Sequence, residues 1–238
     1  MVKKYRAGPA RVTRWDSLRA PDADHLLSHS SLAVPPSSAL PSLLRRVAVC
    51  KLNGGLGTSM GCRDPKSALI VRDGQSFLDL TVEQLLHLQD RHGVRIPLLL
   101  MNSFYYTHEK SQRLLRDYRN RLDIRSFQQN RYPRFREGAE TFLSEKEFGR
   151  DAWYPPGHGD FYTCFQDHGL LDQLIQEGRE ILFIANADNL GAVIDPALLS
   201  FMIREELPFL MEMTPKTPAD VKGGTLYQEN GKLKLLEI

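Results

Sequence analysis

Short apolar runs alternate with amphipathic stretches from about residue 45 to the end of the chain. These runs have the length of buried strands, and the first of them, 47–50, is apolar and partly β-branched. The strands predicted in this way lie at residues 47–50, 67–71, 96–101, 124–128, 180–186 and 208–213. The run 180–186 is the clearest candidate for a central strand.

The stretches between the strands carry helical spacing. Ser76 can cap a helix in which Leu78, Val82 and Leu85 fall on one face, and Gly93 ends that helix. Further helices are predicted at 107–118, 170–176 and 196–206, and a hairpin is predicted around 229–232. Strands alternating with helices are typical of an α/β layer architecture.

The first 43 residues are polar and rich in proline and serine, so we expect a surface arm there. Residues 44–238 then form the folded domain, with a charged and irregular excursion at 138–150. The chain stops inside an apparent strand, which suggests a fragment or a shortened reading frame.

Bulk properties exclude several classes of protein. Among 238 residues, 42% are apolar and 25% are charged, and the net charge is only +2, so neither a nucleic-acid nor a membrane partner is indicated. The three cysteines show no metal-ligand spacing, which favours reduced thiols. The basic start leads into no apolar segment, and no run of about 18 apolar residues occurs. We therefore expect a cytoplasmic, soluble protein.

One glycine-rich stretch, residues 51–67, follows the first strand and carries the strongest chemical signal. Its four glycines lie within eight residues, and Lys66 stands near its end. Glycines let backbone amides approach a polyphosphate closely, and a lysine adds a cation. The stretch nevertheless fails the dinucleotide fingerprint by one residue, and Pro65 stands where a P-loop has glycine. An ordinary glycine-rich turn with a solvated Lys66 remains the alternative.

Other motifs place that stretch in a family. Seven motifs follow one another from about Val47 to the last residue. They are LNGGLGTSMG with PKS after it, FLDLTVEQ, MNSF, a glutamine-bearing run before RYPR, WYPPGHGD, ANADNLGA, and TPKTPADVKGGTL with LLEI. In this order they resemble the UTP–glucose-1-phosphate uridylyltransferases. The resemblance implies a mostly parallel, Rossmann-like sheet flanked by helices, of the nucleotide-diphospho-sugar transferase type. It also implies that the chain is roughly the N-terminal half, without the completed sugar pocket and the C-terminal β-helix.

The same resemblance implies an activity: Mg²⁺-dependent, reversible transfer of uridylyl from UTP to glucose 1-phosphate, giving UDP-glucose and pyrophosphate. Such a transfer needs charge neutralisation and in-line positioning more than a strong base. Lys66 matches a catalytic cation that meets the phosphates, His158 a contact to glucose 1-phosphate, and Asp188 a metal ligand. The implied UTP-binding residues are Leu52, Asn53, Gly54, Gly55, Lys66, Gln129 (to the uracil), Gly157, Asn186 and Asp188.

Each of these residues, taken alone, can also have an ordinary structural role. His158 can be a simple loop histidine, Asp188 a helix cap, and Gln129 an ordinary polar loop residue. Asp64 also departs from the family, which commonly has glycine there, and puts an anion near the phosphates, although Arg63 offsets it. A truncated, non-catalytic nucleotide-binding or regulatory module therefore stays open as an alternative. A nicotinamide dehydrogenase is disfavoured because the third glycine is displaced.

Overall fold

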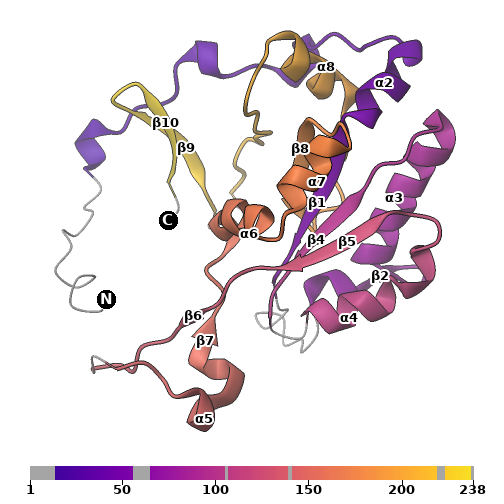
Figure 1. The fold of residues 1–238 in the computed structure, drawn as a ribbon. Helices are drawn as coiled ribbons and strands as arrows, with labels where there is room; N and C mark the ends of the chain where they lie inside the picture. Colours follow the sequence, from indigo (N-terminus) through magenta and orange to yellow (C-terminus); the bar gives the residue numbers. More distant parts are fainter. Residues whose placement is uncertain (1–13, 56–64, 105–106, 139–140, 219–222, 237–238) are drawn as a thin grey trace. The chain divides into compact units, whose positions relative to one another are not determined.

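A computed structural model describes residues 14–55, 65–104, 107–138, 141–218 and 223–236 (Figure 1). By internal contacts the chain divides into two compact units: residues 35–196, and residues 1–34 together with 197–238. The predicted division into an arm, 1–43, and a nucleotidyltransferase domain, 44–238, concerns function and stays a prediction.

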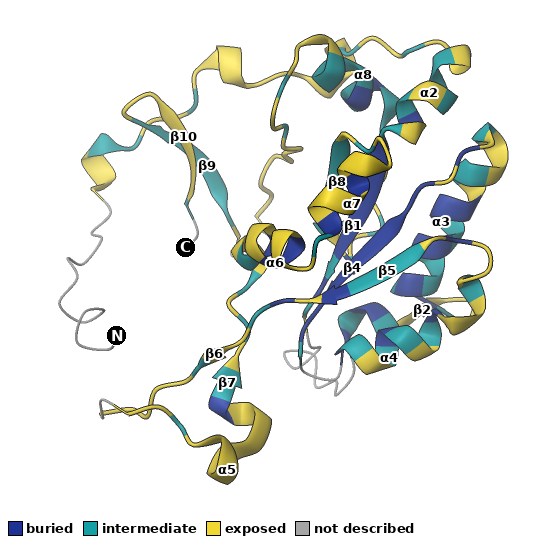
Figure 2. Cartoon of the chain, in the orientation of Figure 1, coloured by how far each residue is buried: buried dark blue, intermediate teal, exposed yellow. Residues whose placement is uncertain are grey.

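The larger unit is built on a parallel four-stranded sheet. Its strands lie in the order β5-β4-β1-β8 and are β1 (Val47–Asn53), β4 (Leu98–Asn102), β5 (Ile124–Gln128) and β8 (Ile181–Asn186). The strands predicted at 47–50, 96–101, 124–128 and 180–186 are thus confirmed. The central strands β1 and β4 are almost wholly buried, as Figure 2 shows, whereas the outer strands β5 and β8 are only half-buried.

Helices cover both faces of this sheet (Figure 1). On one side lie α3 (Phe77–His92) and α4 (Thr107–Leu114), and on the other α6 (Phe161–Asp167) and α7 (Leu170–Gln176). Alternate residues of the strands, such as Cys50 and Met101, pack with Phe161 and Leu174 from α6 and α7 in one apolar cluster. The α/β class with a parallel sheet is therefore confirmed.

The start of α3 shows how local sequence fixes an element. The Ser76 hydroxyl accepts the Asp79 amide at 3.2 Å, and the Asp79 carboxylate accepts the Ser76 amide at 2.8 Å, which completes a capping box. Gly93 ends the helix in the left-handed conformation, with φ of 61°. Both predicted ends of this helix are confirmed.

The remaining elements of the larger unit are short. They are the 3-10 helices η4 (Ser37–Ala39), η6 (Lys66–Ala68), η7 (Arg116–Tyr118), η8 (Gly149–Ala152) and η9 (His158–Asp160), the helices α2 (Leu40–Arg45) and α5 (Glu145–Phe148), and the strand pairs β2 (Ile70–Arg72) with β3 (Gln75–Ser76) and β6 (Tyr132–Pro133) with β7 (Trp153–Tyr154). The excursion at 138–150 is exposed where the structure describes it, as predicted.

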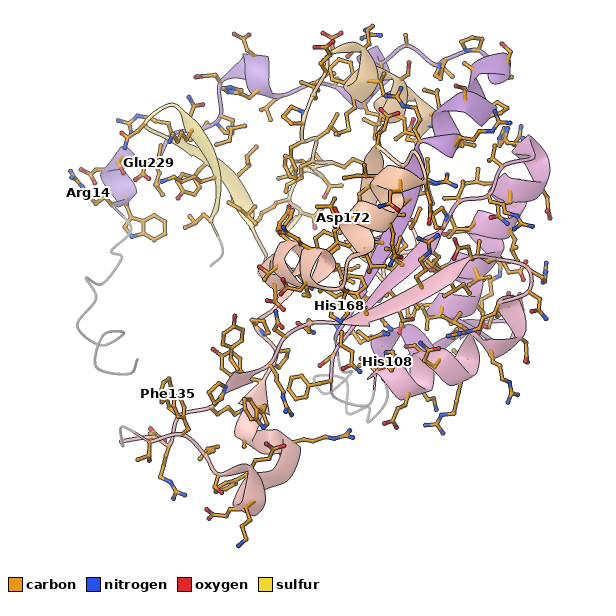
Figure 3. All side chains as sticks on the ribbon, viewed as in Figure 1. Arg14, His108, Phe135, His168, Asp172 and Glu229 are labelled. Atoms are coloured by element: carbon orange, nitrogen blue, oxygen red, sulfur yellow. The ribbon has the colours of Figure 1, made fainter. Side chains whose placement is uncertain are left out.

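In the smaller unit, β9 (Thr225–Glu229) and β10 (Lys232–Leu236) form the predicted hairpin. The 3-10 helices η1 (Trp15–Ser17), η2 (Ala23–His25) and η3 (His29–Ser31) and most of α8 (Pro196–Arg204) belong to the same unit. Arg19 pairs with Gln228 of β9, and Arg14 lies near Glu229 in Figure 3. The N-terminal segment is thus partly ordered by backbone pairing with the hairpin.

Three secondary-structure predictions were wrong. Residues 208–213 form no strand, and Phe209 is 62% exposed, because no described segment pairs with them. The strand predicted at 67–71 begins only at Ile70, since Lys66–Ala68 turns as a 3-10 helix, and β2 is exposed. The strand 180–186 lies at an edge of the described sheet, so its apolar character does not reflect a central position.

Candidate nucleotide-binding site

The carboxyl ends of the parallel strands bring the predicted polar segments to one edge of the sheet. Leu52 of β1 lies opposite Asn186 of β8, and Asn53 lies opposite Asn102 of β4. The Ala187 amide donates to the Leu52 carbonyl at 3.0 Å, which continues the pairing past the end of β8. In open α/β sheets this edge is where ligands bind.

The side chain of Asn53 is a structural clamp beneath that edge. Its Nδ2 donates to Asn102 Oδ1 at 2.6 Å and to the Ser111 hydroxyl of α4 at 2.7 Å, and its Oδ1 accepts from the Ser67 hydroxyl. Asn102 in turn contacts His108 Nδ1 at 3.3 Å, at the start of α4 (Figure 3). Both the amide nitrogen and the oxygen of the Asn53 side chain are therefore engaged in hydrogen bonds within the protein. The predicted contact of Asn53 with a nucleotide through its backbone stays a prediction.

Gly54 and Gln129 form the tightest contact of the site. A Cβ placed on Gly54 would lie 2.3 Å from Gln129 Nε2, so only glycine lets the two segments come this close. Gln129 is 7% exposed, and its buried Oε1 has no hydrogen-bond partner among the residues that the structure describes. Since a buried, unpartnered acceptor is costly, its presence is typical of a group that awaits a ligand donor.

Lys66 and Asp188 face one another from opposite sides of the same edge. Lys66 Nζ lies 3.7 Å from Asp188 Oδ2, and both side chains are about one-third exposed, at 37% and 35%. The Lys66 amide also donates to the Gly55 carbonyl at 3.2 Å, which ties η6 to the end of β1. A long, half-exposed ion pair contributes little to stability, so both charges are available to a phosphate and a cation.

Lys51 was missed by the sequence reasoning. It is 2% exposed, and its Nζ donates to the carbonyls of Asn189 and Ala192 at 3.2 and 3.1 Å. Burial lowers the pKa of Lys51 to about 8, against the attraction of the Asp188 carboxylate, which raises it. Lys51 thus fastens the loop that carries Asp188 to β1. A lysine inside an otherwise apolar strand was the signal that could have revealed it.

Gly157 and His158 lie on a separate segment, at the start of η9. Gly157 has φ of 98°, a conformation that favours glycine, and η9 follows it. His158 is exposed, whereas Asp160 binds Asn130, the residue after Gln129, through both carboxylate oxygens. Asp160 is the second residue that the sequence reasoning missed.

The predicted site residues are therefore placed as follows. Hydrogen bonds, strand register or close contact join the strand-end residues, the glycine loop and the Lys66–Asp188 pair: Leu52, Asn53, Gly54, Gly55, Lys66, Gln129, Asn186 and Asp188. Asp160 links the turn that contains Gly157 and His158 to Asn130, the residue after Gln129. Arg63 and Asp64 lie outside the described residues.

A metal ion would have few protein ligands here. Among the described residues, no group of three His, Cys, Asp or Glu side chains could hold one. Asp188 is nevertheless half-buried beside Lys66 at the sheet edge. One carboxylate suits Mg²⁺, which keeps its waters and takes further oxygens from substrate phosphates. The donor set thus fits Mg²⁺ delivered with a nucleotide.

A pocket of about 630 Å³ in the larger unit lies elsewhere. It opens between α3 and residues 190–194, and its lining is mainly apolar, with Lys51 at the sheet. Of the predicted site residues none is among those that line it. The chemistry therefore points to the strand-end edge and not to this pocket.

Comparison with known proteins identifies the family. A sequence model of the UTP–glucose-1-phosphate uridylyltransferases matches residues 2–238. The chain belongs to this family. The uridylyltransferase of Hordeum vulgare is 44% identical over 244 residues, which cover 100% of this chain and 51% of that protein. The Saccharomyces cerevisiae protein of the same name is 46% identical over 226 residues, which cover 94% and 45%.

Solved structures of UDP-glucose pyrophosphorylases share the uridylyltransferase fold seen here. The Trypanosoma brucei enzyme superposes with a TM-score of 0.81 at 37% identity, over 99% of this chain and 50% of that one. A Leishmania major variant in complex with UDP-glucose gives 0.83 at 31% identity, over 99% and 52%. The chain thus spans about half the length of these relatives, in line with the expectation of half of such a protein.

Within the described residues, no helix is long and apolar enough to cross a bilayer.

Proposed function

We propose that this chain carries the UTP-binding part of a uridylyltransferase that joins UTP and glucose 1-phosphate to give UDP-glucose and pyrophosphate. One observation carries the proposal: the buried, unpartnered Oε1 of Gln129 beside Gly54, on the edge where Lys66 and Asp188 meet. A carboxamide offers one acceptor and one donor, which match the N3–H and a carbonyl of uracil. A site of this kind discriminates bases by leaving its polar groups unpaired when the wrong base enters.

The reaction asks for charge neutralisation at this edge. A phosphate oxygen of glucose 1-phosphate attacks the α-phosphorus of UTP, and the bond from that phosphorus to the oxygen bridging to the β-phosphate breaks. The released electron pair leaves with pyrophosphate. Lys66 neutralises negative charge on the phosphates, backbone amides of the glycine loop bind them, and His158 contacts the glucose 1-phosphate. Mg²⁺, when bound by Asp188 and the phosphates, supplies further neutralisation.

The proposal includes a reducing, cytoplasmic setting. Cys50 and Cys164 are buried free thiols, and burial raises the pKa of each to about 12. Such thiols are inert packing groups and not the disulfide partners usual in secreted proteins.

The alternative is a module of the same family that binds UTP without turning it over. The chain spans about half the length of its relatives, so its turnover is to be tested and not assumed. Binding and turnover separate the two. We expect the 238-residue chain to bind UTP with Mg²⁺ in calorimetry, and pyrophosphate release with glucose 1-phosphate then decides for the transferase, whereas binding alone decides for the module.

Lys66→Ala tests the assigned cation against Lys110→Ala, a lysine on α4 outside the proposed site. Losing one charge-assisted contact to phosphate should weaken UTP binding about tenfold or more. UTP binding by Lys66→Ala equal to that of the unmodified chain would refute the role of Lys66.

A further inference from the structure

The carboxylate of Asp160 receives hydrogen bonds from a segment 30 residues away. The Asn130 amide donates to Oδ2 at 2.7 Å, and Asn130 Nδ2 donates to Oδ1 at 3.1 Å. The buried Cys164 thiol lies 3.1 Å from Oδ2 and 2.7 Å from the Asp160 carbonyl. Both carboxylate oxygens are therefore used, and the two Asn130 bonds are charge-assisted, which makes them stronger than neutral ones.

A structural cap is the ordinary role for an aspartate at this place. Asp160 occupies the N-cap position of α6, where such a side chain usually accepts a backbone amide of the first helical turn. Its carboxylate makes no such bond here. The carboxylate accepts the two Asn130 bonds and a bond from the Cys164 thiol instead, so it joins the loop after β5 to α6.

This loop carries Gln129. The Gln129 amide donates to the Asn102 carbonyl at 2.9 Å, at the end of β4, and the next amide, of Asn130, is held by Asp160. Both amides that flank the Cα of Gln129 are thus fixed. The Oε1 of Gln129 accepts no hydrogen bond from the described part of the chain, so the placement of its side chain depends on this backbone clamp.

Asp160 also belongs to the segment that carries His158. Its amide donates to the Gly157 carbonyl at 3.2 Å and closes the turn that contains His158. One residue therefore connects the loop proposed to read the base with the turn proposed to meet glucose 1-phosphate.

We infer that Asp160 is a positioning residue, which orients the Gln129 carboxamide for uracil and joins it to the His158 turn through Asn130. The inference rests on the proposed function. A carboxamide that rotates by half a turn exchanges its donor and acceptor and then suits cytosine. Loss of the clamp should therefore reduce the preference for uracil as well as the affinity.

The test compares Asp160→Asn with Asp167→Asn, the same substitution at an exposed position on α6. Asn keeps the shape of the side chain but removes the charge and turns one acceptor into a donor that faces Asn130. Calorimetric titration of the 238-residue chain with UTP and with CTP gives affinity, binding stoichiometry and the ratio between the two nucleotides. We expect Asp160→Asn to bind UTP about tenfold more weakly, with a UTP-to-CTP ratio near one and unchanged stoichiometry. Asp167→Asn should match the unmodified chain.

Each other outcome has a defined meaning. If the unmodified chain does not prefer UTP to CTP, the proposed function and the inference both fall. If the unmodified chain prefers UTP and Asp160→Asn keeps this preference, only the inference falls. A kept preference with a lower binding stoichiometry has the same meaning, because it shows that Asp160 matters for folding and not for the choice of base. Asn130→Ala removes the 3.1 Å bond alone and should shift the ratio in the same direction by a smaller factor. An unshifted ratio in Asn130→Ala overturns the inference even where Asp160→Asn does not fold.

Discussion

Gly54→Ala is the sharpest single test of the proposed base-recognition site. The backbone of Gly54 lies outside the left-handed region, so alanine fits the local conformation, and only the added Cβ disturbs the structure. That Cβ would lie 2.3 Å from Gln129 Nε2, whereas the next contacts, Gln129 Cδ at 3.5 Å and Ser103 Cβ at 3.8 Å, are ordinary. The perturbation therefore falls on one atom at the end of a flexible side chain.

The size of the effect follows from that geometry. Restoring an ordinary separation of about 3.5 Å moves the Gln129 amide by roughly 1 Å. A side chain pushed off its rotamer costs about 0.5–1.5 kcal/mol, so the free energy of unfolding should fall by about 1 kcal/mol. Two misplaced hydrogen bonds to the base, at about 1 kcal/mol each, weaken UTP binding by about 2 kcal/mol, which is roughly thirtyfold.

The assay pairs calorimetric titration with UTP and urea denaturation. Gly159→Ala is the matched control, because its added Cβ meets no atom within 4 Å and its φ is not positive. We expect the control to bind UTP and unfold as the unmodified chain does. UTP binding by Gly54→Ala within twofold of the unmodified chain, with folding preserved, would refute the placement of the uracil at Gln129.

Three further predictions address charge, metal and core. The pKa of Lys51 is lowered in the folded state to about 8. Above that pH the unfolded chain binds more protons than the folded chain, so stability rises with pH. The free energy of unfolding should therefore be about 1 kcal/mol higher at pH 9 than at pH 7.5. Lys51→Met should lack this rise in urea denaturation, and an equal rise in both proteins would contradict the assignment. Asp188→Asn should weaken Mn²⁺ binding to the UTP complex about tenfold in a spectroscopic titration, and unchanged affinity would remove Asp188 as a ligand. Leu100→Ala, at a fully buried position of β4, should lower the free energy of unfolding by about 2–5 kcal/mol. Ile175→Ala, at a position 61% exposed, should change it by less than about 1 kcal/mol. Equal losses in the two variants would contradict the burial of Leu100.

The predictions that succeeded depend on local patterns. The strand at the start of the sheet, the capping box at Ser76 and the end of the helix at Gly93 follow from composition, spacing and backbone preference within a few residues. The order of the motifs alone was enough to indicate the family.

The failures depend on partners distant in sequence. Residues 208–213 have the composition of a strand, but a strand exists only where another backbone pairs with it. The position of β8 at an edge of the described sheet could likewise not be predicted, because an apolar run does not determine how many strands pair with it.

The amino-acid sequence by itself determined the α/β alternation, the local starts and ends of its helices and the set of residue types that a uridylyl transfer needs. Only the tertiary structure decided how those residues are used. The side chain of Asn53 bonds to Asn102 and Ser111, Lys51 holds the loop of Asp188, and Asp160 binds Asn130 in place of a backbone amide of the first turn of α6. The physical reason is that a local pattern fixes the backbone conformation of a segment. The partner of a polar side chain is set instead by the register and packing of segments that lie 30 to 141 residues apart.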